Sequence, residues 1–176
     1  AARALPAGSS REPFLNHTRA AMTPGIIAAQ QSGIPHRIHK YEHDPASTSY
    51  GLEAAEKLQV PAARVFKTLV VQLDNKVLAV GVLPVSALLS MKQIAKSAGA
   101  RKAGMAPPAD VVRSTGYVLG GVSPLGQKRR LITVIDASAL NFDTVYVSAG
   151  RRGLEIELQP EDLKKLVNGS FADICQ

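Results

Sequence analysis

Cysteine and aromatic residues are scarce in this chain of 176 residues, which has one cysteine, no tryptophan, four tyrosines and four phenylalanines. A single cysteine, Cys175, excludes an internal disulfide and a cysteine-rich zinc site, and it favours a reducing, cytoplasmic location. So few aromatic side chains make a stacking platform for single-stranded bases a poor fit. No apolar run reaches the roughly 18 residues of a membrane-spanning helix, so we expect no membrane partner.

Positive charge, in contrast, is in excess, since 21 Lys and Arg outnumber 14 Asp and Glu and the net charge is +7. This balance favours an anionic partner such as a nucleic acid or a phosphate. The length predicts one domain, large enough to bury about 70% of the surface of its unfolded chain. Residues 1–21 lack periodicity and contain Pro, Gly, Ser and Arg, so we interpret them as an N-terminal extension and expect a single domain over residues 22–176.

Periodicity and capping residues predict a mixture of helices and strands. Thr23 is a good N-cap, Pro24 fits a first helical position and Gly33 can close the helix. The expected helices cover residues 24–32, 51–58, 90–98 and 107–113, and a last one begins at residue 160. The expected extended segments cover residues 34–43, 65–73, 76–83, 131–136, 144–149 and 154–158. Irregularly interspersed strands and helices indicate an α+β fold with a curled, mixed or mainly antiparallel sheet.

Lys67 interrupts the apolar segment VFKTLVVQL, in which Val65, Lys67, Leu69 and Val71 share one face of the expected strand. Burying an ammonium group among apolar side chains is costly unless an anion meets it. Two interpretations stay open. One is a strand-end lysine whose amine reaches water, and the other is a lysine directed at a phosphate or a developing negative charge.

A glycine-rich segment, STGYVLGGVSPLG, follows the helix expected over residues 107–113, and we expect a short strand within it. Its residues with unusual backbone preferences are Gly116, Gly120, Gly121, Pro124 and Gly126. Glycine lets a ligand approach backbone N–H groups closely, so this loop could cradle a phosphate or stabilise an oxyanion. It matches neither the dinucleotide fingerprint nor the P-loop. A set of tight turns without a ligand is the alternative.

Two short basic runs supply five of the 21 positive charges. They are Lys128, Arg129 and Arg130, directly after the glycine-rich segment, and Arg151 with Arg152. A basic run usually forms a solvated face of the protein. The alternative here is a contact with an RNA end beside the glycine-rich loop.

The remaining titratable residues complete no recognisable site. His36, His39 and His43 lie close together, but no cysteine or well-spaced carboxylate joins them, so we expect no metal and interpret them as solvent-facing residues of an edge strand. A Ser-His-Asp triad stays open, although no nucleophile motif supports it. Glu155 and Glu157 alternate with apolar residues and are interpreted as the wet face of a strand, from which one could reach a site.

Several segments together resemble one protein family. They are MTPGI, HKYEHDP, GLEAAEKL, FKTLVV, STGYVLGGVSPLGQKRR, TVYVSAGRRGLEIEL and PEDL. In this order and spacing they resemble the bacterial YbaK/EbsC-type Cys-tRNA(Pro) deacylases, free-standing relatives of the editing domain of bacterial prolyl-tRNA synthetases. The resemblance runs from Met22 to nearly the end of the chain, and residues 1–21 lie outside it.

The resemblance implies a barrel-like sheet of about six strands surrounded by helices, and an enzyme that needs no cofactor and removes cysteine from mischarged Cys-tRNA(Pro). It implies that Lys67 of the FKTL motif is essential and that the loop holds the scissile carbonyl, to which Gly120 and Gly121 would donate N–H groups. The residues expected around the substrate are Tyr41, Ser123, Pro124, Leu125, Gly126 and Glu155, the last where a close family pattern has Asp. The implied partners are tRNA and a prolyl-tRNA synthetase, not DNA, and both basic runs would contact the tRNA.

The family chemistry agrees with the lack of a protein nucleophile motif. In this family the cysteine thiol of the substrate attacks its own ester carbonyl and releases a cyclic thiolactone. Such an intramolecular attack can gain about 7–11 kcal/mol from effective molarity. Two alternatives stay open. One is a deacylase of another misacylated tRNA such as Ala-tRNA(Pro), which needs an activated water, and the other is a noncatalytic tRNA-binding module.

Overall fold

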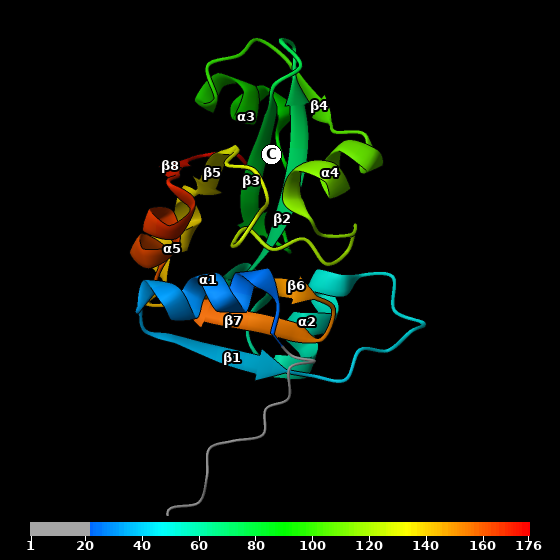
Figure 1. Cartoon of the computed structure of the whole chain (residues 1–176), viewed down its shortest axis with the longest axis vertical. Coiled ribbons are helices and arrows are strands. Elements are labelled where there is room, and N and C mark those ends of the chain that lie inside the picture. Colours follow the sequence, from blue (N-terminus) through cyan, green and yellow to red (C-terminus); the bar gives the residue numbers. More distant parts are fainter. Residues whose placement is uncertain (1–21) are drawn as a thin grey trace, which may run out of the picture.

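The computed structural model describes residues 22–176, so the interpretation of residues 1–21 as an extension lies outside it. Within this range the chain forms five α-helices and eight β-strands (Figure 1). The helices are α1 (Pro24–Ser32), α2 (Tyr50–Leu58), α3 (Met91–Ser97), α4 (Pro108–Thr115) and α5 (Pro160–Val167). The strands are β1 (His36–Lys40), β2 (Val65–Leu73), β3 (Leu78–Pro84), β4 (Ala103–Met105), β5 (Ile132–Asp136), β6 (Val145–Arg151), β7 (Leu154–Leu158) and β8 (Ser170–Ala172).

The first helix shows how local sequence sets the element boundaries. The Thr23 hydroxyl accepts a hydrogen bond from the Ile26 N–H at 3.2 Å and donates one to the Ala149 carbonyl, which fixes α1 against β6. Pro24 occupies the first turn, and Gly33 ends the helix in the left-handed conformation at φ 72°. The predicted start and end of this helix are confirmed.

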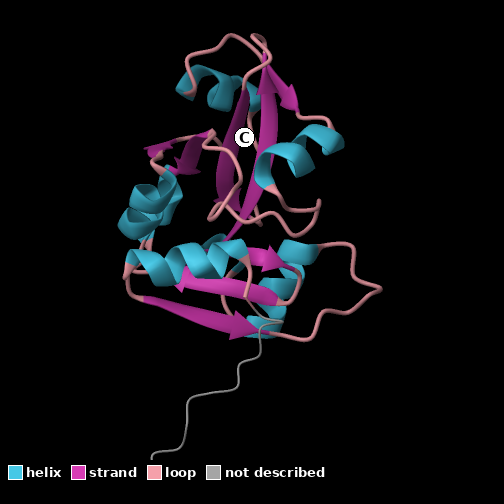
Figure 2. Ribbon diagram, in the orientation of Figure 1, coloured by secondary structure: helices cyan, strands magenta, loops and turns pink. Residues whose placement is uncertain are grey.

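All strands belong to one mixed sheet in the order β1-β7-β6-β2-β3-β5-β8, with β4 paired to β2 (Figure 2). The β2–β6, β3–β5 and β5–β8 pairs are parallel, and the other pairs are antiparallel. The sheet curls into a half-barrel with helices around it, so the predicted α+β fold is confirmed. The six longer strands correspond to the six that were expected. Strands β4 and β8 have three residues each, too few to produce a recognisable alternation in the sequence.

One edge of β2 is shared by two strands that do not meet. Strand β6 pairs with Val65 and Phe66, and β4 pairs with β2 from Val71 onward. The Ala106 N–H donates to the Val70 carbonyl at 3.1 Å. Within residues 22–176, residues 67–69 therefore have no partner strand on this edge, and the sheet is open at that point.

Strand β2 also divides the core. Phe66 and Val70 belong to a large apolar cluster that includes residues of both ends of the sheet, whereas Val71 belongs to a second cluster under α3. Leu69 packs against this second cluster, so Lys67 lies on the face that the alternation predicted.

The predicted short strand within residues 114–126 is wrong, because this segment is held by turns and side-chain hydrogen bonds. Gly116 and Gly120 have positive φ angles of 81° and 86°, which interrupt an extended conformation. The Tyr117 hydroxyl donates to the Leu125 carbonyl at 2.7 Å and closes the loop on itself. Over the described range, no helix is both long and apolar enough to cross a membrane.

Candidate active site

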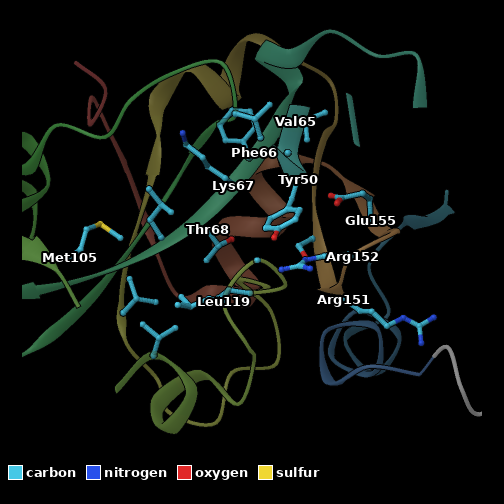
Figure 3. Close-up of a pocket in the computed structure, with 18 of the residues that line it drawn as sticks. Tyr50, Val65, Phe66, Lys67, Thr68, Met105, Leu119, Arg151, Arg152 and Glu155 are labelled. Atoms are coloured by element: carbon cyan, nitrogen blue, oxygen red, sulfur yellow. The ribbon is translucent and has the colours of Figure 1, made fainter. Parts of the chain in front are cut away.

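A pocket of about 260 Å³ lies where the sheet is open (Figure 3). Strand β2, the start of α2, the glycine-rich loop and the β6–β7 turn all contribute to its walls. The residues expected from the sequence that line it are Tyr41, Lys67, Gly120, Arg151, Arg152 and Glu155. The other residues expected around the substrate do not line this pocket. They are Gly121, Ser123, Pro124, Leu125 and Gly126.

Lys67 contributes to the pocket wall, but its amine is held outside. The ammonium group donates a 2.6 Å hydrogen bond to the Ala87 carbonyl, and Figure 3 shows it directed away from Thr68 and Arg152. Burial lowers the pKa of Lys67, and the neighbouring Cys175 acts against this shift. Neither interpretation of the sequence foresaw a backbone carbonyl as the partner of this amine.

The segment that carries Ala87 is tied to the last residues of the chain. The Ser90 N–H donates to the Ile174 carbonyl at 2.7 Å, and the Ile174 N–H donates to the Asp136 carboxylate at 3.0 Å. Burial, followed by the negative charge of Asp136, raises the pKa of Cys175 to about 11. Cys175 is therefore a neutral thiol at physiological pH and a poor nucleophile.

Glu155 is the buried carboxyl group of the pocket. The residue is 7% exposed, and its side chain forms no hydrogen bond or ion pair with the rest of the described chain. Burial raises its pKa to about 8, so the carboxyl is largely protonated at neutral pH. The interpretation of Glu155 as part of a wet strand face is wrong, because the opposite Ser148 and nearby Tyr41 belong to the same enclosed wall.

Glu157, two residues further along β7, has the opposite environment. Its carboxylate accepts from Thr144 at 2.5 Å, lies 2.9 Å from His39 Nε2 and forms an ion pair with Arg64 at 3.4 Å. Burial raises its pKa, but these hydrogen bonds and charges outweigh burial and leave the pKa below its ordinary value. Glu157 thus has several partners, whereas the Glu155 carboxyl lines the pocket and has no partner among residues 22–176.

Thr68 is a pocket residue that sequence reasoning missed. Its side-chain hydroxyl is buried and has no hydrogen-bond partner in the described part of the chain. Thr68 lies in the middle of the open edge of β2 and lines the pocket. Threonine is common in strands, so nothing in the sequence distinguished it. A buried unpaired hydroxyl is costly, which makes Thr68 a good candidate to bind a polar ligand group.

The two central glycines of the loop have different roles. Gly120 lines the pocket, and its N–H makes no hydrogen bond within residues 22–176. The Gly121 N–H donates to the Val118 carbonyl at 3.0 Å and closes a turn. Gly120 is therefore the better placed donor for a ligand oxygen.

The second half of the loop and the first basic run lie elsewhere. Ser123 and Leu125 are buried behind the loop, where the Leu125 N–H donates to the Ser123 hydroxyl at 3.1 Å. A second hollow of about 370 Å³ lies between α1 and α5, and its lining includes Pro124, Gly126, Lys128, Arg129 and Arg130. The pocket and this hollow share no lining residue. The two basic runs, which we expected to contact the same RNA end, therefore line separate hollows.

The three histidines do not form a metal site, and no group of three or more His, Cys, Asp or Glu in the described range could hold an ion. His39 pairs with Glu157, and His43 Nδ1 lies 3.1 Å from the Glu53 carboxylate. His36 Nδ1 lies 2.8 Å from the Ile34 carbonyl. The part of the chain that the structure describes contributes neither His nor Cys to the pocket wall.

Residues 43–166 match the aminoacyl-tRNA editing domain family. The protein EbsC of Enterococcus faecalis, named as a candidate Cys-tRNA(Pro)/Cys-tRNA(Cys) deacylase, is 37% identical over 152 residues, which is 86% of this chain and 92% of that protein. The uncharacterized protein YwhH of Bacillus subtilis is 30% identical over 125 residues, or 70% of this chain and 79% of its own.

Two solved structures share the fold. A candidate trans-editing enzyme for prolyl-tRNA synthetase has a TM-score of 0.75 at 22% identity, covering 88% of this chain and 99% of the other. The hypothetical protein APE2540 has a TM-score of 0.78 at 25% identity, covering 88% and 100%. The family match, the similarity to EbsC and the resemblance found in the motifs agree, and the chain belongs to the aminoacyl-tRNA editing domain family.

Proposed function

We propose that this protein is an aminoacyl-tRNA deacylase that removes cysteine from mischarged Cys-tRNA(Pro). The observation that carries the proposal is the small pocket with a buried, unpartnered carboxyl group, Glu155, and no histidine or cysteine among its described lining residues. A volume of about 260 Å³ suits a small aminoacyl ester and part of its ribose. The similarity to EbsC, which carries the name of such a deacylase, supports this substrate class.

Glu155 binds the α-ammonium group that every aminoacyl ester carries. A cation beside a carboxyl group favours its ionised form, so substrate binding would lower the raised pKa of Glu155 and create a buried ion pair. The unpaired hydroxyl of Thr68 supplies a further hydrogen bond to the aminoacyl group or the ribose. Both contacts exist only with the substrate bound.

The substrate supplies the nucleophile. The cysteine sulfur attacks its own ester carbonyl carbon, the bond from that carbon to the ribose oxygen breaks, and the thiol proton ends on the departing hydroxyl. The products are a thiolactone and the free tRNA, and no water is consumed. The Gly120 N–H stabilises the developing oxyanion, and loss of one such donor typically costs about 2.7–4 kcal/mol.

Lys67 provides a cation for the ribose and phosphate of the terminal nucleoside. Its amine has a backbone carbonyl and no carboxylate as its partner in the described structure, so rotation of the side chain toward a bound anion breaks one hydrogen bond and no ion pair. The runs at 128–130 and 151–152 add positive charge for the tRNA, and a prolyl-tRNA synthetase would be the source of the misacylated substrate.

The test is a deacylation panel with Cys-, Ser-, Ala- and Pro-tRNA(Pro). We expect rapid release of cysteine and slow release of the other three, because only cysteine carries a thiol. Equal rates for Cys-tRNA(Pro) and Ser-tRNA(Pro) would exclude the thiol mechanism and indicate an activated water.

Two further results would favour the other functions. Preference for Ala-tRNA(Pro) would identify an alanine-editing enzyme. Tight, salt-sensitive tRNA binding without release of any amino acid would identify a binding module.

A further inference from the structure

Three segments that are distant in sequence meet at the mouth of the pocket. They contribute Tyr50 at the start of α2, Gly120 in the loop and Arg152 in the β6–β7 turn. The guanidinium carbon of Arg152 lies 3.7 Å from the centroid of the Tyr50 ring, so the two groups are stacked (Figure 3). Gly120 leaves the space for this stack, because a Cβ there would lie 2.7 Å from Arg152 Nη2 and 2.8 Å from Tyr50 Cε2.

Arg152 is an uncompensated cation. It is exposed and forms no ion pair with a carboxylate of residues 22–176. Arg64 offers the contrast, because its guanidinium carbon lies 5.2 Å from the Tyr146 ring centroid and is also held by Glu157. The Arg64 contact is explained by its ion pair with Glu157. The Arg152 stack lies at the mouth of the pocket and has no such ion pair among the described residues.

Tyr50 also contacts a histidine. The His43 ring meets it edge-on at a centroid distance of 5.8 Å, and His43 Nδ1 lies 3.1 Å from the buried Glu53 carboxylate. Burial raises the pKa of Glu53, but its hydrogen bonds outweigh burial and keep the pKa below its ordinary value. A planar aromatic group is thus fixed at the mouth, with a planar cation lying on it.

We propose that Tyr50 and Arg152 form a subsite that stacks the purine base of the nucleoside carrying the aminoacyl ester. The inference rests on the proposed function, since an ester inside the pocket places its ribose at the mouth and the attached base beside this pair. Guanidinium and tyrosine planes both stack on nucleobases, and the charge of Arg152 also suits the adjoining phosphate. The small number of aromatic residues excludes an extended platform but leaves room for one base.

The test measures binding of an RNA microhelix whose 3′-terminal residue carries cysteine through an amide bond, which is not cleaved. One version ends in adenosine and a second has an abasic terminal residue. Arg152→Lys keeps the charge and removes the plane, and Arg130→Lys in the second hollow is the matched control. We expect Arg152→Lys to weaken the adenosine RNA about tenfold and the abasic RNA less than twofold, with Arg130→Lys affecting both equally.

An equal loss for the two RNAs with Arg152→Lys would overturn the proposal, because it would mean that Arg152 contacts only phosphate or structure. Absence of binding of the adenosine RNA to the wild-type protein would also overturn it. Tyr50→Phe should retain the preference for adenosine, and Tyr50→Leu should lose it while thermal unfolding shows an intact fold. The amide-linked RNAs measure binding alone, so the two proposals can fail separately. A protein that prefers the adenosine RNA but releases no cysteine from Cys-tRNA(Pro) would have the subsite and would not be a deacylase.

Discussion

The ammonium group of Lys67 and the carbonyl oxygen of Ala87 lie 2.6 Å apart. This hydrogen bond satisfies a cation on an otherwise apolar strand face without neutralising its charge. A carboxylate in the same position would form an ion pair with the lysine and neutralise its charge. An anionic ligand that displaces the Ala87 carbonyl would therefore meet the full positive charge of Lys67.

Replacing this amine should separate activity from stability. We expect Lys67→Ala to reduce deacylation of Cys-tRNA(Pro) about 100-fold, since loss of the charged partner of the substrate's ribose and phosphate typically costs about 2–5 kcal/mol. The fold should remain, because Lys67 forms no ion pair with the described residues. Single-turnover kinetics and thermal unfolding measure the two effects. Near-normal turnover would refute the role of this lysine.

Glu155→Gln should change how stability depends on pH. The pKa of Glu155 is raised from 4.5 to about 8 by burial, so the native state binds this proton more tightly than the unfolded state. Its contribution to stability is complete below pH 4.5 and is lost as the pH rises to about 8. The Tm of wild type relative to Glu155→Gln should therefore fall over this range.

Glu157→Gln is the matched control for that measurement. The pKa of Glu157 is lowered despite burial, so its carboxylate stabilises the fold at neutral pH and this contribution is lost on acidification. Glu157→Gln should have a lower Tm than the wild type at pH 7, and the two Tm values should approach each other at low pH. If the Tm difference between wild type and variant changed with pH in the same direction for Glu155→Gln and Glu157→Gln, the environments assigned to the two glutamates would be wrong.

Thr68→Val should make the free protein more stable and less active. Valine has a similar shape and removes a buried hydroxyl without a partner, so the free energy of unfolding should rise by about 1 kcal/mol. The missing hydrogen bond to the substrate should lower kcat/KM about tenfold. Chemical denaturation and steady-state deacylation test this pair of effects, and unchanged activity would exclude contact with the substrate.

Two alanine substitutions in the loop, Gly120→Ala and Gly121→Ala, should have very different effects on stability and activity. Gly120→Ala forces a left-handed residue at φ 86° and brings a methyl group to within 2.8 Å of Tyr50, so it should cost about 1–3 kcal/mol and most of the activity. A Cβ at Gly121 would meet nothing closer than 3.5 Å, and its φ is not positive, so Gly121→Ala should be mild. Comparable losses in both would argue against the separate roles of the two amides.

The run at 128–130 should contribute to tRNA affinity and little to chemistry. Changing Lys128, Arg129 and Arg130 to Gln should reduce the slope of log K against log salt by about 0.7–0.9 for each phosphate that the protein no longer binds. The rate at saturating tRNA should be retained, because these residues line the second hollow and not the pocket. Lys92→Gln with Lys96→Gln on α3 is the control, and an equal change in slope there would indicate only a general charge effect.

Sequence patterns predicted the long elements well, because their signals are local. The nine residues of β2 and the capped ends of α1 could be predicted from alternation, proline and glycine. The contact of Lys67 with Ala87 could not be predicted, since it depends on a turn held by the far end of the chain.

The pocket wall was predicted in part for a similar reason. Motifs placed Lys67, Gly120 and Glu155 at the site, but Tyr50 and Thr68 carry ordinary helix and strand signals. Nor did spacing reveal that the loop turns back after Gly121, so that Ser123 is buried and the first basic run faces a different hollow. Which residues meet there is decided by tertiary packing.

The opening in the sheet also has a mechanical consequence. In the part of the chain that the structure describes, strands β1, β7 and β6 join the rest of the sheet through two residue pairs, Val65 with Tyr146 and Phe66 with Val147. So short a junction leaves the large apolar cluster, which contains residues of both halves, to hold the wall that carries Glu155 against the wall that carries Thr68. A ligand that spans both walls would add a further link between them, so we expect amide exchange at Phe66 to slow when the pocket is filled.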